Sequence, residues 1–306
     1  MEKRLLGNTQ LPVSILGYGA MELGRLETTD AGQILNKVLD LGINYIDTSP
    51  DYGPSEEMIG KTLAHRRSEY FLASKCGCNV DSTGKGQSPA HIWTRQQLLW
   101  NIDNSLRLLK TDHLDVWQLH GTLPEELAGG PTGEVIQTLQ EIKRQGKVRW
   151  IGLSFKNGGP GDLLYPDGYT QAYLAGFLEW NAFDLFQVVY GGLVRRNETA
   201  IATAATKGLG VVARGVVKQY QPNITERFSQ ANLQELCAPG ETMSQFLLRF
   251  GMNHPGISTM IIGTANPAHL EENIKSAHAG KLADPIYSEA RRRLDAVVRL
   301  CRQRLA

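Results

Sequence analysis

The size, composition and charge of the chain exclude several classes of protein. Its 306 residues are 42% hydrophobic and 21% charged, with a formal net charge of +1, so it can bury a large core but offers no electrostatic attraction for nucleic acid or a membrane surface. No apolar run approaches the ~20 residues of a membrane span and no signal peptide leads the chain, so we expect a cytoplasmic protein.

Short runs rich in β-branched and other apolar residues recur along the chain and predict strands. They cover residues 15–17, 43–47, 70–74, 115–119, 148–153, 185–189, 209–213 and 258–262. Residues 3–13 precede them, with Gly7-Asn8 at a turn, and predict a hairpin.

Segments with helical periodicity lie between these runs. Their apolar stripes are Ile34, Val38 and Leu41; Leu98, Leu99, Ile102, Leu106 and Leu109; Val135, Ile136, Leu139 and Ile142; and Phe246, Leu247 and Phe250. Candidate N-caps are Thr29-Asp30, Thr94, Thr132 and Thr242, and candidate left-handed C-caps are Gly42, Gly146 and Gly208. Residues 285–305 predict a closing helix.

Strands that alternate with helices pair in parallel through crossovers. Eight such units in about 270 residues fit a closed (β/α)8 TIM barrel better than an open sheet. We expect one domain over residues 1–306, in which the hairpin of residues 3–13 closes the bottom of the barrel.

Cysteine usage indicates a reducing compartment. The four cysteines, Cys76, Cys78, Cys237 and Cys301, are too few and too scattered for a disulfide framework. Cys76 and Cys78 lack the two-residue spacer and the second pair that a structural zinc site uses. We therefore expect free thiols and no metal site.

A barrel of this kind carries its chemistry at the C-terminal ends of its strands. The residues in or just after those ends are Asp47, Lys75, His120, Ser154, Gln187 and Arg214, and Tyr52 lies on the loop after Asp47. Each residue alone has an ordinary structural explanation. An Asp, a Lys and a His at successive strand ends together indicate a catalytic site.

Four of these residues suit acid–base chemistry on a carbonyl or an alcohol. The phenol of Tyr52 has a reference pKa of about 10, and we expect the Lys75 ammonium to favour the phenolate, more so in a partly desolvated site. Asp47 would keep Lys75 protonated, and His120 would donate a hydrogen bond to the same substrate oxygen. Tyr52 is then a general acid or base, and the hydride must come from a nicotinamide because no side chain supplies it.

Residues 260–273, MIIGTANPAHLEEN, are the best candidate for a phosphate site. A predicted strand leads into Gly263-Thr264, and Asn266-Pro267 opens a helix whose N-terminus favours anions. The stretch GYGAMELG, residues 17–24, has Glu22 where a dinucleotide-binding fingerprint requires its third glycine, so it is not such a motif.

These motifs resemble those of the aldo-keto reductases along nearly the whole chain. The matching stretches are GYGAMELG (17–24), NYIDTSPDYG (44–53), Ala73-Ser74-Lys75, Leu119-His120, IGLS (151–154), Phe186-Gln187, and Ile262-Gly263-Thr264 with Glu272-Asn273. The family's catalytic tetrad falls on Asp47, Tyr52, Lys75 and His120. The wording DTSPDYG most resembles the L-galactose dehydrogenase and aldose 1-dehydrogenase-like branch.

The resemblance implies a nicotinamide cofactor extended across the barrel mouth. The positions that it assigns to the cofactor are Ala20, Met21, Asp47, Ser154, Gln187, Arg214, Gly263, Thr264, His269, Glu272 and Asn273. Ser154 and Gln187 match the carboxamide positions, and Arg214 matches one that packs on the nicotinamide or reaches the pyrophosphate. The residues from Gly263 onward match the adenosine-phosphate end.

The chain departs from the family pattern at four places, one of which is Arg214-Gly215-Val216-Val217 in place of the usual Ser-Pro-Leu. Phe155 stands where many members have an Asn that holds the carboxamide. Gly263 and His269 stand where NADP-specific members have Lys and Arg, and a neutral His holds a 2′-phosphate less firmly than an Arg fork. We favour NADP(H) and leave NAD(H) open.

The loops expected around the mouth indicate the substrate. They are residues 76–93, 121–131, 156–170 and 214–241, of which the first two are polar and favour a sugar or a hydroxy-aldehyde over a steroid. The expected function is NAD(P)-dependent hydride transfer on a small carbonyl or sugar substrate, by a monomer or weak homo-oligomer. Two alternatives remain: a non-catalytic nicotinamide-binding regulatory subunit, and a phosphate-binding isomerase that would leave Asp47 and Gln187 unused.

Overall fold

The computed structural model describes residues 1–155, 169–195, 197–217 and 223–303. In these ranges, eight parallel strands form a closed barrel in the order β10-β11-β12-β3-β4-β5-β8-β9. Their bounds are β3 Leu16–Gly19, β4 Tyr45–Asp47, β5 Phe71–Cys76, β8 Leu114–His120, β9 Val148–Ser154, β10 Leu185–Val189, β11 Gly210–Arg214 and β12 Thr259–Ile262. Every predicted strand contributes to the barrel, so the (β/α)8 prediction is confirmed.

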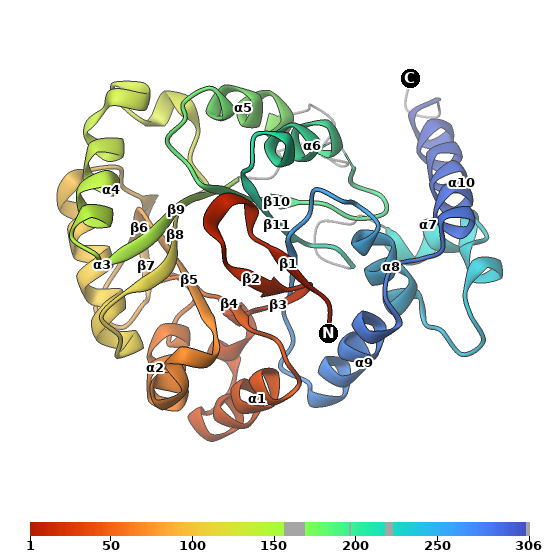
Figure 1. The fold of residues 1–306 in the computed structure, drawn as a ribbon, viewed down its shortest axis with the longest axis horizontal. Coiled ribbons are helices and arrows are strands. Elements are labelled where there is room, and N and C mark those ends of the chain that lie inside the picture. The colour runs from red at the N-terminus through yellow and green to blue at the C-terminus, as the bar shows by residue number, and fades with distance from the viewer. Residues whose placement is uncertain (156–168, 196, 218–222, 304–306) are drawn as a thin grey trace.

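Helices surround the barrel (Figure 1). They are α1 Thr28–Asp40, α2 Ser55–Leu63, α3 Arg95–Leu109, α4 Glu134–Arg144, α5 Tyr169–Leu178, α6 Glu198–Thr206, α7 Ile224–Gln230, α8 Met243–Met252, α9 Pro267–Ala279 and α10 Asp284–Gln303. Each predicted apolar stripe lies in or at the end of a helix; in α4 its members Val135, Ile136, Leu139 and Ile142 are all buried. Among the described residues, none of the helices combines the length and hydrophobicity that a bilayer span requires.

Two of the predicted N-caps are confirmed. The side chains of Thr94 and Thr242 accept hydrogen bonds from backbone N–H groups in the first turns of α3 and α8. Thr132 is wrong as a cap because Gly133 precedes α4. The Thr29-Asp30 prediction is also wrong, since α1 already begins at Thr28.

The predicted glycine C-caps take the left-handed conformation. Gly42, Gly146 and Gly208 have φ angles of +88°, +77° and +76°, which side chains with a Cβ rarely adopt. These glycines turn the chain from α1, α4 and α6 toward β4, β9 and β11.

A hairpin of β1 Lys3–Leu5 and β2 Pro12–Ser14 closes the bottom of the barrel, the end facing the viewer in Figure 1. Its Leu6, Leu11 and Val13 are buried in one cluster with Tyr45, Ala73, Val116, Leu185 and Val212 of the barrel strands. A Cβ on Gly7 would stand 2.3 Å from the backbone nitrogen of Gly210, so the turn accepts only glycine. The predicted plug is confirmed.

Loop 76–93, predicted only as a polar loop, contains a second hairpin. Its strands are β6 Cys78–Val80 and β7 Gly86–His91, with Cys78 opposite His91. The hairpin follows the C-terminal end of β5, so it stands at the barrel mouth. Of the other predicted loops, residues 156–168 and 218–222 lie outside the described residues, as does the end of the predicted closing helix, residues 304–305.

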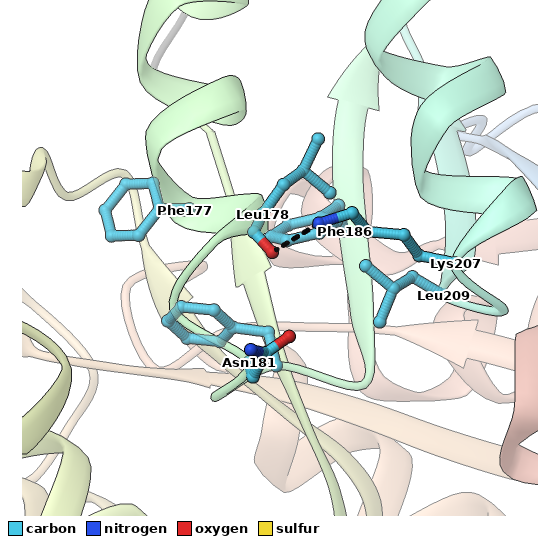
Figure 2. A pocket seen from close by; sticks show the side chains of 7 residues that line it. Phe177, Leu178, Asn181, Phe186, Lys207 and Leu209 are labelled. Atoms are coloured by element: carbon cyan, nitrogen blue, oxygen red, sulfur yellow. Dashed lines mark hydrogen bonds between the residues drawn. The ribbon is translucent and has the colours of Figure 1, made fainter.

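A pocket lies at the opposite end of the barrel (Figure 2). It is lined by Phe177, Leu178, Asn181, Phe183, Phe186, Lys207 and Leu209. Asn181 precedes β10 and Lys207 precedes β11, so the pocket lies at the N-terminal ends of those strands. Lys207 crosses it and donates from Nζ to the carbonyl oxygen of Leu178 at 3.3 Å. Because barrel chemistry gathers at the other strand ends, this pocket is not the candidate site.

The adjacent residues Leu5 and Leu6 test the plug. Leu6 is fully buried, whereas Leu5 is 54% exposed. We expect Leu6→Ala to lower the free energy of unfolding by about 2–5 kcal/mol, through lost burial and the cavity left behind. The matched control Leu5→Ala should change it by less than about 0.5 kcal/mol. Urea denaturation of both variants measures the difference, and equal effects would contradict the plug.

Candidate active site

The strand register places the predicted residues on neighbouring strands near the barrel mouth. Gln118 of β8 stands opposite Lys75 of β5. Ser154 of β9 stands between His120 of β8 and Gln187 of β10. Asp47 ends β4, the neighbour of β5. Gln187 is the central residue of β10, and the other positions belong to the C-terminal halves of their strands, where the sequence predicted the site.

Lys75 and Asp47 form a buried ion pair. Nζ of Lys75 lies 2.7 Å from Oδ2 of Asp47, and their side chains are 0% and 1% exposed. Lys75 also donates to the carbonyl oxygen of Thr48 at 2.7 Å. Burial lowers the pKa of Lys75, but the charges of Asp47 and Tyr52 outweigh burial and raise that pKa above its usual value. Lys75 is therefore cationic at any physiological pH.

Two amides hold the other oxygen of Asp47. Gln118 donates to Oδ1 at 3.0 Å and Gln187 donates to it at 2.8 Å. Ser154 in turn donates to Oε1 of Gln187 at 3.0 Å. Sequence reasoning missed Gln118, although side chains alternate along a strand and this places Gln118 on the same face as His120.

Tyr52 lies beside Lys75, as predicted. The ammonium nitrogen is 4.8 Å from the centre of the Tyr52 ring, within range of a cation–π interaction. The pKa of Tyr52 is nevertheless raised, because burial raises it more than the charge of Lys75 lowers it. The charge of Lys75 lowers the pKa of Tyr52, as expected, but burial disfavours the phenolate more strongly, so the expected net preference for the phenolate is not observed.

His120 meets a polar cluster through one ring nitrogen. Its Nδ1 lies 3.2 Å from Sγ of Cys78, 3.3 Å from Oγ of Ser49 and 3.3 Å from Oδ2 of Asp51. The ring is edge-on to Tyr52, with centroids 6.1 Å apart. Burial lowers the pKa of His120 more than the charge of Asp51 raises it, so the imidazole is neutral.

Asp51 remains ionised beside this imidazole. Burial raises the pKa of Asp51, but hydrogen bonds from His120 and Ser49 and the charge of Lys75 outweigh burial and hold that pKa below its usual range. Ser49 also donates a hydrogen bond to Asp51. The loop that carries Tyr52 is thus fixed to His120 through Ser49 and Asp51.

The charge of Arg214 acts on residues of the mouth, whereas the ring of Phe155 points away from it. Arg214 donates from Nη2 to the carbonyl oxygen of Phe155 at 2.8 Å, and its charge acts on Tyr52 and His120. The Phe155 ring packs outward against Phe177 and Phe186, with centroids 5.9 Å and 5.6 Å away. Phe155 therefore does not replace the polar side chain that many family members have at this position.

The segment predicted to hold phosphate has the expected strand-to-helix geometry. A Cβ on Gly263, just after β12, would stand 3.3 Å from the carbonyl oxygen of Gly19 at the end of β3. The carbonyl oxygen of Thr264 accepts from the Tyr18 hydroxyl at 2.9 Å. Asn266 caps α9 by accepting from the N–H of Ala268 at 2.9 Å.

The other predicted cofactor residues flank this segment. Ala20 is buried and Met21 is 39% exposed, on a 3-10 turn of residues Ala20–Arg25. His269 and Glu272 are exposed and Asn273 is half-buried, in the first two turns of α9. Glu22 of the turn lies beside Gly263 and pairs with Arg25, with Nη1 of Arg25 2.6 Å from Oε2 of Glu22.

Comparison with known proteins identifies the family to which the chain belongs. The model described as "Aldo/keto reductase family" matches residues 15–292. The chain belongs to the aldo-keto reductase family.

Relatives and solved structures agree with this assignment. The chain is 26% identical over 298 residues to an uncharacterised oxidoreductase, YqkF, of Bacillus subtilis, covering 93% of this chain and 94% of the relative. It is 27% identical over 295 residues to L-galactose dehydrogenase of Arabidopsis thaliana, covering 90% and 87%. A holo-form aldo-keto reductase structure from Bacillus halodurans superposes with a TM-score of 0.77 at 26% identity, over 97% and 96% of the two chains.

Family membership makes the protein an NAD(P)H-dependent oxidoreductase that acts on small carbonyl substrates. The family's chemistry requires a nicotinamide, which the isomerase alternative does not use. Nothing in these comparisons supports the regulatory-subunit alternative.

Sequence reasoning missed Glu56, a buried carboxyl near the Lys75–Asp47 ion pair. It lies in the first turn of α2 and accepts from Oγ of Ser74, the neighbour of Lys75, at 2.6 Å. Burial raises the pKa of Glu56 to about 7, against the lowering effect of the Ser74 hydrogen bond. Two glutamates at a helix start resemble a solvated turn, so the sequence does not reveal this burial.

Glu56 makes stability depend on pH. Its pKa is raised from 4.5 to about 7 in the folded chain, so the folded state binds more protons than the unfolded state between these values. Stability from this group is therefore greatest at low pH and is lost as pH rises through the folded pKa. Because glutamine does not ionise, we expect Glu56→Gln to gain about 2–3 kcal/mol relative to wild type between about pH 5 and pH 8.

Denaturation of both proteins across this pH range measures the gain. Glu57→Gln is the matched control, since Glu57 is exposed on the same helix turn and pairs with Lys61 at 2.8 Å. Its difference from wild type should stay nearly constant. If the difference in unfolding free energy between Glu56→Gln and wild type is equally constant, Glu56 does not change its protonation state in this pH range.

Proposed function

We propose that the protein transfers hydride between a nicotinamide and the carbonyl or alcohol carbon of a polar substrate, a sugar or a hydroxy-aldehyde. Tyr52 exchanges a proton with the substrate oxygen. The observation that carries this proposal is the Lys75 ammonium, held in a buried ion pair and 4.8 Å from the centre of the Tyr52 ring.

Lys75 serves this chemistry as a fixed charge. Its raised pKa keeps the proton on nitrogen, so the ammonium is not itself the acid. When the Tyr52 proton moves to the substrate oxygen, negative charge develops on the phenol, and the adjacent cation stabilises it. Burial alone disfavours the phenolate, so the reaction depends on this cation.

His120 positions the substrate oxygen. A neutral His120 donates to Asp51 when its proton is on Nδ1. When the Cys78 thiol, within hydrogen-bonding distance of the same nitrogen, donates to Nδ1 instead, the ring proton resides on Nε2. A neutral imidazole with its proton on Nε2 donates a hydrogen bond to the oxygen that accepts the Tyr52 proton. Two donors on one oxygen stabilise its negative charge better than one.

The residues around the mouth fit a nicotinamide dinucleotide. When bound, the nicotinamide supplies or accepts the hydride. Ser154 and Gln187 offer a hydroxyl and an amide to its carboxamide, and Gln187 has a second N–H besides the one that Asp47 accepts. Gly263 follows β12 and lies just before α9, whose N-terminal N–H groups favour a phosphate.

NADP(H) is the preferred cofactor in this proposal. His269 is exposed in the first turn of α9, where a ring N–H donor and the helix N-terminus would both favour a 2′-phosphate. Ala20, Met21, Thr264, Glu272 and Asn273 complete the proposed adenosine-phosphate end, and Arg214 lies at the nicotinamide end.

The mouth favours a polar substrate with several hydroxyl groups. His91 stacks on Trp93 with centroids 5.7 Å apart and meets His120 edge-on at 5.2 Å. Asp51 and Ser49 lie beside Nδ1 of His120. Aromatic faces beside a carboxylate and a hydroxyl suit a sugar, and one relative is named as a dehydrogenase of L-galactose.

Tyr52→Phe tests the proton donor. We expect kcat to fall by at least ~100-fold, since general acid catalysis is lost, while nicotinamide binding stays within about twofold because no proposed cofactor contact is removed. Tyr70→Phe is the matched control: its hydroxyl is buried without a hydrogen-bond partner in the described structure. Steady-state turnover on an aldose and aldehyde panel, with fluorescence titration of the cofactor, gives both values. Turnover near the wild-type rate in Tyr52→Phe would reject this assignment.

His269→Ala tests the cofactor preference. We expect the Kd for NADPH to rise several-fold and the Kd for NADH to change little, because only NADPH carries the 2′-phosphate. Fluorescence titrations at matched salt measure both. His278→Ala, in the last turn of the same helix, should leave both values unchanged. Equal losses for the two cofactors in His269→Ala would remove His269 from the phosphate site.

A further inference from the structure

A second cluster of chemically active side chains lies at the edge of the mouth. Asp51, Cys78, His91 and His120 each direct one ligand-type atom, an oxygen, a sulfur or a ring nitrogen, into a common space, and these atoms lie within 4.8 Å of one another. They come from the loop after β4, the start of β6, the end of β7 and the end of β8. We propose that this cluster binds a divalent zinc-class cation.

The distances between the ligand atoms suit a tetrahedral metal. With Zn–N and Zn–O bonds of about 2.0–2.2 Å and Zn–S bonds of about 2.3 Å, tetrahedral ligands stand roughly 3.3–3.8 Å apart. Nδ1 of His120 already lies 3.2 Å from Sγ of Cys78 and 3.3 Å from Oδ2 of Asp51. The remaining separations need to shorten by about 1 Å at most to reach that range.

The hairpin provides two of the ligands as a preformed pair. Cys78 and His91 stand opposite each other in the β6–β7 register, and directly opposed residues in antiparallel strands have neighbouring Cβ atoms. Asp51 and His120 face this pair from the barrel. A bound cation would therefore tie the hairpin to the barrel, and through Asp51 to the loop that carries Tyr52.

The ligand types select the kind of cation. One sulfur and two imidazole nitrogens favour zinc or a similar borderline cation over magnesium or calcium, which prefer oxygen ligands. Binding forms a metal–sulfur bond and releases the thiol proton of Cys78 to solvent. Because the cation takes Nδ1 of His120, the ring proton stays on Nε2, where the proposed function requires it. The side chains of Asp51 and His120 are 28% and 18% exposed, so a cation reaches the cluster from the mouth.

Metal binding to the full-length protein, after dialysis against a chelator, tests this proposal. We expect one Zn²⁺ per chain in competition with a chromophoric chelator, a rise in Tm on adding Zn²⁺, and a thiolate-to-metal charge-transfer band with Co²⁺. Cys78→Ser should abolish the band. His91→Ala should weaken Zn²⁺ binding by more than the roughly 10- to 100-fold that loss of an outer-shell partner costs.

Cys237→Ser is the matched control, because Cys237 is not a member of this cluster and donates to the carbonyl oxygen of Leu233; it should keep the band and the affinity. Zn²⁺ binding that is equally strong in Cys78→Ser and His91→Ala would show an adventitious cation and overturn the proposal. Absence of binding in the wild type would overturn it too. If Cys78→Ser does not fold, as judged by circular dichroism, the half-buried His91 still decides the outcome. None of these measurements requires turnover, so the proposed function and the metal site are tested independently.

Discussion

Lys75 and Asp47 hold opposite charges away from water, where removing each ion from solvent costs several kcal/mol. The barrel compensates for this cost with hydrogen bonds, from Lys75 to the Thr48 carbonyl and from Gln118 and Gln187 to Asp47. A pair of apolar side chains would stabilise the core at least as well. What the ion pair provides instead is a cation whose position and charge do not change while the neighbouring phenol exchanges its proton.

The fold was predictable because its signals are local and repeated. Eight apolar runs alternate with amphipathic helices, and this alternation admits few architectures. The β6–β7 hairpin was not predictable, since residues 86–90 are all exposed and lack the alternation of a half-buried strand. The caps at Thr29 and Thr132 failed because a suitable side chain marks a helix start only to within one or two residues.

Site residues were predictable where a polar residue ends an apolar strand. Properties that depend on several neighbouring groups at once, such as a pKa, were not. Asp47, Lys75 and His120 are visible as polar ends of apolar runs. The raised pKa of Tyr52 is a balance between burial and four nearby charges, and no spacing reveals its sign. The sequence also does not reveal that Cys78 and His91 are neighbours. Spacing rules for metal sites look for pairs of cysteines close in sequence, whereas these two residues are brought together by the hairpin.

The hairpin at the bottom of the barrel has a consequence for the order of binding. Leu6, Leu11 and Val13 fill the barrel interior from below, so every molecule that reaches Tyr52 must enter and leave through the mouth. In the proposed function, the nicotinamide lies on Ser154 and Gln187, deeper than the rings of His91 and Trp93 that face the substrate. With a single entrance, the deeper molecule would have to enter first and leave last, so each new turnover would wait for the spent cofactor to leave.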